Sequence, residues 1–140
     1  MAVKGPEPLP YTLVAGADLS DKQFAPIAIN AAGQAIVSNG AGTVFIGVLE
    51  NKPKLAEHAT VQLGPCVTKV RVGLAVTAGN YLTIQSGGWF IPGNAATFNN
   101  SLWLNAGSKT ALAGVAFETV ASGGIATAKL FQALTFVNSN

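Results

Sequence analysis

Short apolar runs, each bounded by turn residues, recur along most of the chain and predict β-strands rather than helices. The runs are rich in Val, Ile and Thr, and Gly or Asn stands in many of the gaps between them. The segments that we predict as strands are 26–29, 34–37, 43–50, 59–63, 67–72, 81–84, 89–91, 111–118 and 123–130. Gly33 stands in the first hairpin turn, where glycine permits the positive φ that such a turn needs. The pattern therefore predicts an all-β fold, a compact β-barrel or β-sandwich of short antiparallel strands.

The order of these segments in the second half of the chain resembles that in the first, which favours two related halves. Gly47 matches Gly114 and Ala59 matches Ala126 at the same separation along the chain, whereas Gly33 matches Gly88 at a shorter one. The change of separation places an insertion in the second half, within residues 92–110. If the chain is duplicated, the strands around Gly47 and Gly114 have equivalent strand partners.

Two irregular segments accompany the predicted strands. Proline at every second position from Pro6 to Pro10 favours an extended, polyproline-like conformation, so we predict an N-terminal arm over residues 1–16 and a single β-domain over residues 17–140. The insertion loop, about 92–110, is rich in Gly, Asn and Ser. Both segments are more typical of contact elements than of a core. The residues that we predict to bind a partner are Lys4, Pro6, Pro8, Pro10, Tyr11, Phe98 and Trp103.

Composition indicates that the chain meets other proteins. With 140 residues, it is long enough for one domain with its own core. Charged residues make up only 10% of the chain, and none occurs between residues 72 and 108. A soluble monomer normally keeps its surface charged. A subunit of an oligomer or larger assembly is therefore favoured over the alternative, a polar but uncharged surface of Asn, Gln, Ser and Thr.

Membrane insertion, secretion and nucleic-acid binding are not expected. No stretch offers the roughly 18 apolar residues of a spanning helix. The N-terminal segment lacks the apolar region of a secretory signal, so we expect a cytosolic product. The net charge is only +2. Lys52, Lys54, Lys69 and Arg71 lack the interleaved aromatic residues of a single-strand binder and are better interpreted as a solvated strand face.

Catalytic and metal-binding patterns are equally sparse, so we expect no enzyme, no metal site and no cofactor. The single histidine, His58, lies in a polar turn without the further ligands that a metal needs. Cys66 is typical of a small buried thiol. Glu50 and Glu118 fall near corresponding places in the two halves, where polar strand ends are a better interpretation than a catalytic carboxylate pair.

Five segments follow one another in a recognisable order: ADLSDKQF at 17–24, IGVLENKP at 46–53, ATV at 59–61, GLAVTAGN at 73–80 and AGVA at 113–116. Together they resemble the small capsid decoration, or cement, proteins of tailed bacteriophages. The resemblance implies an all-β subunit on the capsid exterior of a virion, assembled in the host cytoplasm. It also implies homotrimers that bind the major capsid protein and stabilise the shell by bridging its subunits. No catalytic residue is carried over, since Gly47, Pro53, Gly73, Gly79 and Gly114 occupy turn and packing positions.

Two alternatives stay open. A head-fibre or tail-associated β-structural protein would share the fold but occupy fewer positions on the virion. A carbohydrate-binding β-module would expose Trp89 or Trp103 as a platform for stacking sugars. Large aromatic residues in β-proteins lie more often in a core or an interface, which favours the structural interpretations.

Overall fold

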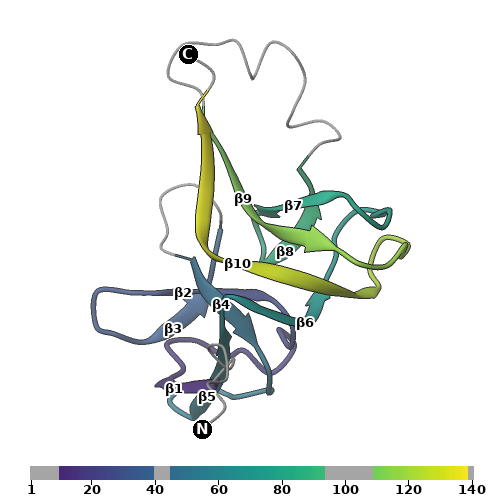
Figure 1. Ribbon diagram of the computed structural model, residues 1–140. Coiled ribbons are helices and arrows are strands. Elements are labelled where there is room, and N and C mark those ends of the chain that lie inside the picture. Colours follow the sequence, from purple (N-terminus) through teal and green to yellow (C-terminus); the bar gives the residue numbers. More distant parts are fainter. Residues whose placement is uncertain (1–9, 40–44, 94–108, 139–140) are drawn as a thin grey trace, which may run out of the picture.

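The computed structural model describes residues 10–39, 45–93 and 109–138, which form ten β-strands (Figure 1). The first half of the chain contributes β1 (Pro10–Val14), β2 (Pro26–Ile29), β3 (Ala35–Val37), β4 (Phe45–Leu49) and β5 (His58–Leu63). The second half contributes β6 (Cys66–Arg71), β7 (Tyr81–Gln85), β8 (Trp89–Pro92), β9 (Lys109–Ala116) and β10 (Ile125–Asn138). Within these ranges there is no helix of the length and apolarity needed to span a membrane.

The strands form two antiparallel sheets, one from each half of the chain. The first sheet has the order β1-β5-β4-β2-β3 and the second the order β6-β10-β9-β7-β8, which confirms the all-β prediction. The two edge strands of each sheet approach at only one parallel bridge, Ala15 with Ala35 in the first sheet and Val72 with Phe90 in the second. The fold is therefore a compact, β-sandwich-like arrangement, and the described strands do not close into the alternative β-barrel.

The two sheets have the same strand order once β1–β5 are matched with β6–β10. The register agrees as well. Gly47 pairs with Leu63 as Gly114 pairs with Leu130, and Ile27 pairs with Gly47 as Leu82 pairs with Gly114. One separation along the chain relates the β2–β3 hairpin to β7–β8, and a longer one relates β4–β5 to β9–β10. These equivalent strand partners confirm the predicted duplication, and the separation changes between β8 and β9.

Gly47 and Gly114 show why the repeated unit has a glycine at this position. A side chain on Gly47 would collide with the backbone carbonyl of Gln62 on β5, and one on Gly114 with the carbonyl of Lys129 on β10. Glycine has no Cβ and therefore lets two neighbouring strands approach this closely. The shared glycine that indicated the repeat in the sequence is thus a packing requirement of both sheets.

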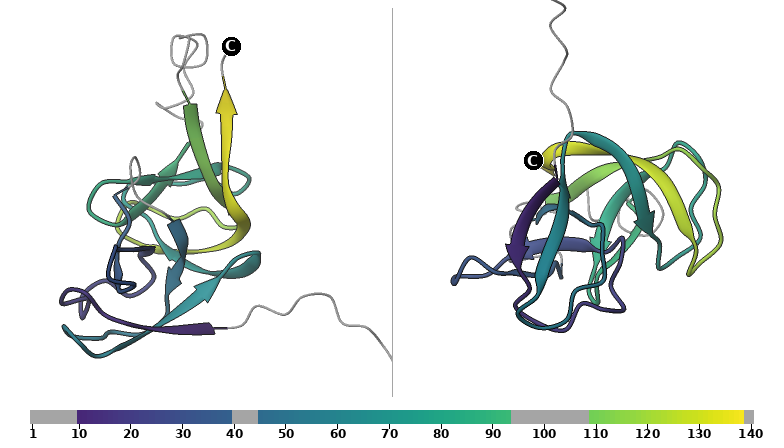
Figure 2. Two further views of the ribbon diagram at one scale, coloured as in Figure 1. Left: turned by 90° about the vertical axis from the view of Figure 1, so that its left-hand side faces the viewer. Right: turned by 90° about the horizontal axis from the view of Figure 1, so that it is seen from below.

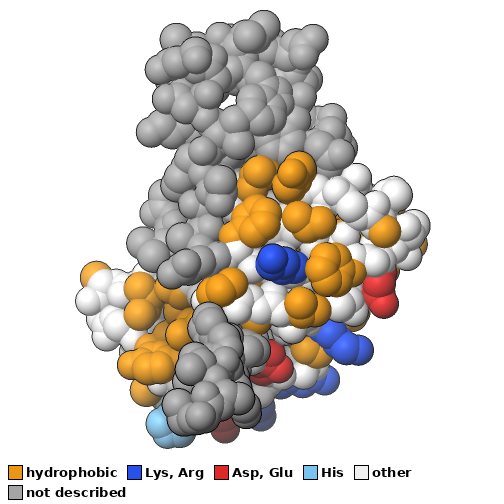
Figure 3. Space-filling view, in the orientation of Figure 1, with side chains coloured by type: hydrophobic (Ala, Val, Ile, Leu, Met, Phe, Trp, Pro, Cys, Tyr) orange, Lys and Arg blue, Asp and Glu red, His pale blue; other side chains and the backbone are white. Residues whose placement is uncertain are grey.

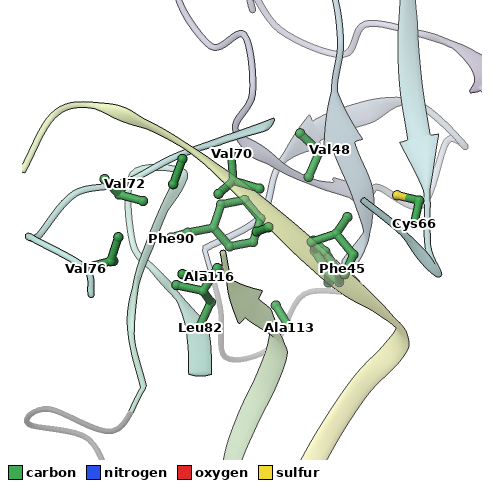
Figure 4. Close-up of a cluster of buried hydrophobic side chains, with 13 residues drawn as sticks. Phe45, Val48, Cys66, Val70, Val72, Val76, Leu82, Phe90, Ala113 and Ala116 are labelled. Carbon is green, nitrogen blue, oxygen red and sulfur yellow. The ribbon is translucent and has the colours of Figure 1, made fainter. Parts of the chain in front are cut away.

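Each half has an apolar core at equivalent positions. The first-half core is Ala15, Leu19, Ile27, Ala35, Leu49, Ala59 and Val61. The counterparts in the second half are Val72, Val76, Leu82, Phe90, Ala116, Ala126 and Ala128. The second core is larger because Phe45 and Val48 of β4 join it (Figure 4), and the ring centroids of Phe45 and Phe90 lie 6.2 Å apart, edge to face. The first sheet therefore packs its outer face, the one turned away from its own core, against the core of the second half.

The N-terminal boundary differs from the predicted arm of residues 1–16. Residues 10–14 form β1, which pairs antiparallel with β5 along its whole length, from Pro10 opposite Gln62 onward. An edge strand tolerates proline because one side of its backbone is free of the ladder. The proline pattern indicated an extended chain, but it could not show that the chain joins a sheet. Residues 1–9 lie outside the described residues.

β10 is longer than the strand predicted at 123–130. It continues to Asn138, and its last residues pair with the start of β9 after a change of register between Leu130 and Thr135. Figure 2 shows this two-stranded ribbon leaving the body of the molecule. Among the described residues the first half has no counterpart, since β4 begins at Phe45 and β5 ends at Leu63.

One pair of equivalent turns differs in a way that affects stability. Ala56 has a φ of 69°, and its counterpart Gly123 has a φ of 85°. Their backbone N–H groups donate to equivalent acceptors, the carbonyl oxygens of Ala15 at 3.0 Å and Val72 at 2.9 Å. Alanine is strained in this left-handed conformation, and the exposed methyl group of Ala56 gains little packing in return.

We expect Ala56→Gly to stabilise the protein by roughly 0.5–1 kcal/mol and Gly123→Ala to destabilise it by at least as much. Both effects are measured as shifts of the urea midpoint followed by far-UV circular dichroism. Ala17→Gly is the matched control, because Ala17 is exposed and does not have a positive φ. The control should lower the stability, and a similar loss for Ala56→Gly would show that the turn is not strained.

Candidate functional site

The residues predicted to bind a partner fall on both sides of the described boundary. Pro10 and Tyr11 lie on β1 at the edge of the first sheet, and the Tyr11 side chain is 55% exposed. The other five, Lys4, Pro6, Pro8, Phe98 and Trp103, lie outside the described residues. The structure thus places an exposed aromatic residue at the point where the N-terminal segment enters the sheet, and the contacts of the remaining five stay a prediction.

A buried guanidinium, that of Arg71, lies at the junction of the two halves. Arg71, the last residue of β6, donates hydrogen bonds from Nε to the carbonyl of Gly88 at 2.7 Å and from Nη2 to that of Gly87 at 2.9 Å. Its Nη1 donates to the carbonyl of Asp21 at 3.0 Å, and its Cζ lies 4.0 Å from the ring centroid of Trp89. Burial lowers the pKa of Arg71, an effect that the charge of Asp21 partly opposes.

Arg71 joins the two halves of the molecule. Asp21 lies in the loop before β2, whereas Gly87 and Gly88 form the turn between β7 and β8. The backbone N–H of Arg71 also donates to the carbonyl of Phe24 at 3.0 Å. Arginine suits this position because its planar group carries several fixed donors and stacks on an aromatic ring.

This arrangement corrects the interpretation of Arg71 as part of a solvated basic face. Lys52, Lys54 and Lys69 are exposed, but Arg71 is only 7% exposed. Lys69 and Arg71 share a strand face, as the alternation predicted, yet the β7–β8 turn covers that face at the end of β6. The stacked guanidinium also occupies one face of the Trp89 ring.

We expect Arg71→Ala to destabilise the protein by about 2–4 kcal/mol, because it removes the donor to the carbonyl of the buried Gly88, two part-buried hydrogen bonds and the stack on Trp89. Arg71→Lys should lie between this variant and the wild type. Lys69→Ala, an exposed position on the same strand, is the control and should change the stability by no more than about 0.5 kcal/mol. The measurement is urea unfolding, and equal effects of Arg71→Ala and Lys69→Ala would contradict the assignment.

His58 and Cys66, which were considered as candidates for chemistry in the sequence, lie apart from any metal-binding cluster of the described residues. His58 is exposed on β5, and its carbonyl accepts a hydrogen bond from Asn51 Nδ2 at 2.9 Å. Cys66 is a buried free cysteine, and burial raises the pKa of its thiol, with a further contribution from the charge of Glu50. Across the described ranges, no group of three His, Cys, Asp or Glu side chains is placed to hold a metal ion.

The register also corrects the proposed match of Glu50 with Glu118. The true counterpart of Glu118 is Asn51, since each accepts a hydrogen bond from a threonine N–H of the return strand. The distances are 2.9 Å from Thr60 N to Asn51 Oδ1 and 2.8 Å from Thr127 N to Glu118 Oε2. Glu118 is thus a turn-capping residue, as the polar-strand-end interpretation expected.

An exposed apolar surface lies on the second sheet, on the face turned away from its core. We define this outer face by Val67, Lys69, Tyr81, Val115, Phe117, Ile125 and Lys129. Val67, Lys129, Val115 and Tyr81 form one continuous row across β6, β10, β9 and β7. Figure 3 shows apolar side chains gathered around a basic one over this sheet.

The exposure of this face is unusual for large apolar side chains. Val67 is 56% exposed, Phe117 51% and Tyr81 48%. An exposed apolar patch, particularly one with aromatic residues, is typical of a protein-binding surface. The sequence pattern does not indicate this face, because its residues lie on four strands whose order follows only from the pairing.

Comparison with known proteins relates the chain to a solved structure. No family model matches the sequence, and no curated protein matches it. Among solved structures, the chain is similar to the N base of head fiber gp8.5 of bacteriophage phi29, with a TM-score of 0.64. The match covers 91% of this chain and 97% of that one at 15% sequence identity. The two chains therefore share a fold over nearly their whole lengths.

Proposed function

We propose that the chain is a non-enzymatic structural protein of a phage virion, attached to the outer surface of the head. The observation that carries this proposal is the fold shared with the base of a phage head fibre across 91% of the chain. The sequence segments that resemble capsid decoration proteins support the same location independently. Both resemblances point to the phage head, one to a fibre base and the other to a shell-stabilising subunit.

The finer proposal is that the chain stabilises the shell by bridging subunits of the major capsid protein, and that it does so as a homotrimer. The small number of charged residues and the apolar outer face of the second sheet support binding to other proteins. In this arrangement the N-terminal segment lies across a neighbouring subunit. Its prolines restrict the unbound chain, which reduces the entropy lost on binding.

A head-fibre base is the second candidate, favoured by the same structural match. Copy number separates the two candidates. In purified virions of the phage that encodes the chain, quantitative mass spectrometry measures its abundance relative to the major capsid protein. A shell-stabilising subunit is expected at a copy number comparable to that of the capsid protein, and a fibre base at far fewer copies. Its absence from virions would contradict both candidates.

We expect deletion of residues 2–9 to weaken attachment to heads while leaving the fold intact, because the deletion ends before β1. Attachment is measured by co-sedimentation with heads that lack the protein, and folding by circular dichroism and urea unfolding. A variant with the same segment in scrambled order is the matched control for length and composition. Unchanged attachment of the deletion variant would exclude a role of this segment.

A further inference from the structure

The internal contact between the two halves shows what can cover the outer face of a sheet of this kind. In the first sheet this face includes Pro26, Phe45 and Val48, all buried. Phe45 and Val48 belong to the same cluster as Val70, Ala113 and Leu130 of the second half. The part of this face on β2 and β4 is therefore packed against the core of the second half, whereas Thr12 on β1 and His58 on β5 are exposed.

At two of these three positions the corresponding face is open in the second half. By the register of the repeat, Tyr81 is the counterpart of Pro26, and Val115 is that of Val48. Leu112, the counterpart of Phe45, is buried. Pro26 is buried and Val48 is fully buried, whereas Tyr81 is 48% exposed and Val115 is partly exposed. The outer face of the second sheet thus corresponds to a surface that is partly covered in the first half, but the described chain has no third unit to cover it.

The surface onto which the first sheet packs also differs in burial between the two halves. Val70, Ala113 and Leu130 are fully buried because the first sheet packs onto them. Their counterparts at the open side of the first-half core are Leu13, Ile46 and Leu63, and all three are only half-buried. We call these three residues the receiving side.

Charge also favours pairing of unlike halves. Residues 1–63 contain five acidic and four basic side chains, whereas residues 64–140 contain one acidic and four basic ones. Lys69 and Lys129 lie on the open outer face. Two outer faces would bring like charges together, whereas an outer face against a first half would bring unlike net charges together.

We propose that a second copy of this chain covers the outer face. The outer face of one copy docks on the receiving side of the next copy, and this interface repeats the contact that joins the two halves within one chain. Such an interface uses different surfaces on the two partners and closes into a ring if the rotation allows it. The inference deepens the self-association part of the proposed function and rests on it only there. Attachment to a phage head is a separate property.

The test uses two variants, each with one side of the interface blocked. Tyr81→Glu places a charge on the outer face, and Leu13→Glu places one on the receiving side. Leu74→Glu is the control, because Leu74 is exposed but belongs to neither surface. Leu63→Glu replaces Leu13→Glu if circular dichroism shows that the latter is unfolded. Masses are measured by light scattering coupled to size-exclusion chromatography.

We expect the wild type and Leu74→Glu to form rings, with a mass of about three times 14.2 kDa for a trimer. Each blocked variant alone should have the mass of a monomer. An equimolar mixture of the two should form dimers, because each variant retains the surface that the other has lost. This restoration distinguishes unlike surfaces from a symmetric contact.

The inference would be overturned if the wild type were a monomer or if the mixture of blocked variants remained monomeric. It would also be overturned if Leu13→Glu still dimerised through two outer faces. Co-sedimentation with heads is measured for the same variants. A wild type that binds heads as a monomer would refute the ring but retain the proposed function, whereas a ring that does not bind heads would do the reverse.

Discussion

The guanidinium of Arg71 lies where the two halves of the molecule meet, and its hydrogen bonds link them. One donor reaches the loop before β2, and two others reach the β7–β8 turn, while Trp89 stacks on its plane. Each half alone has a size at which a core is marginal. Packing Phe45 and Val48 into the second core enlarges the buried apolar volume, and Arg71 supplies the directional contacts that apolar packing lacks. The junction therefore combines apolar burial with directional hydrogen bonds.

Two equivalent units that pack in tandem cannot be equivalent in their surroundings. Part of the outer face of the first half is buried against the second half. The core of the second half is thereby covered on a side where the core of the first half is not. This explains why Val48 is fully buried while Val115 is not, and why Leu130 is buried while Leu63 is only half-buried. The exposed apolar surface of the second sheet is thus a consequence of the duplication itself. A surface of this kind must be tolerated or covered, and its aromatic residues favour covering.

Much of the fold could be predicted from the sequence because short strands with period-two alternation and glycine turns carry local signals. The hairpin around Gly33 and the matched glycines at 47 and 114 predicted both the strands and the repeat. The missed elements depend on long-range pairing: β1 adds to β5, and the end of β10 adds to the start of β9. The same limit applies to the candidate site. Alternation placed Arg71 beside Lys69 on one strand face, but only the packed β7–β8 turn makes the one buried and the other exposed.

The repeat also provides an internal comparison that separates the requirements of the fold from those of function. Positions that are alike in both halves, such as Gly47 and Gly114, maintain the unit, since the same backbone contact recurs in each sheet. Positions that differ show where the surroundings differ. Arg71 corresponds to the exposed Val14, and it differs because it faces the junction. Tyr81 and Phe117 correspond to Pro26 and Glu50, and no junction within the described chain explains these aromatic side chains. Neither core of the described residues uses them, and both lie on the outer face for which a second copy of the chain is proposed as the partner.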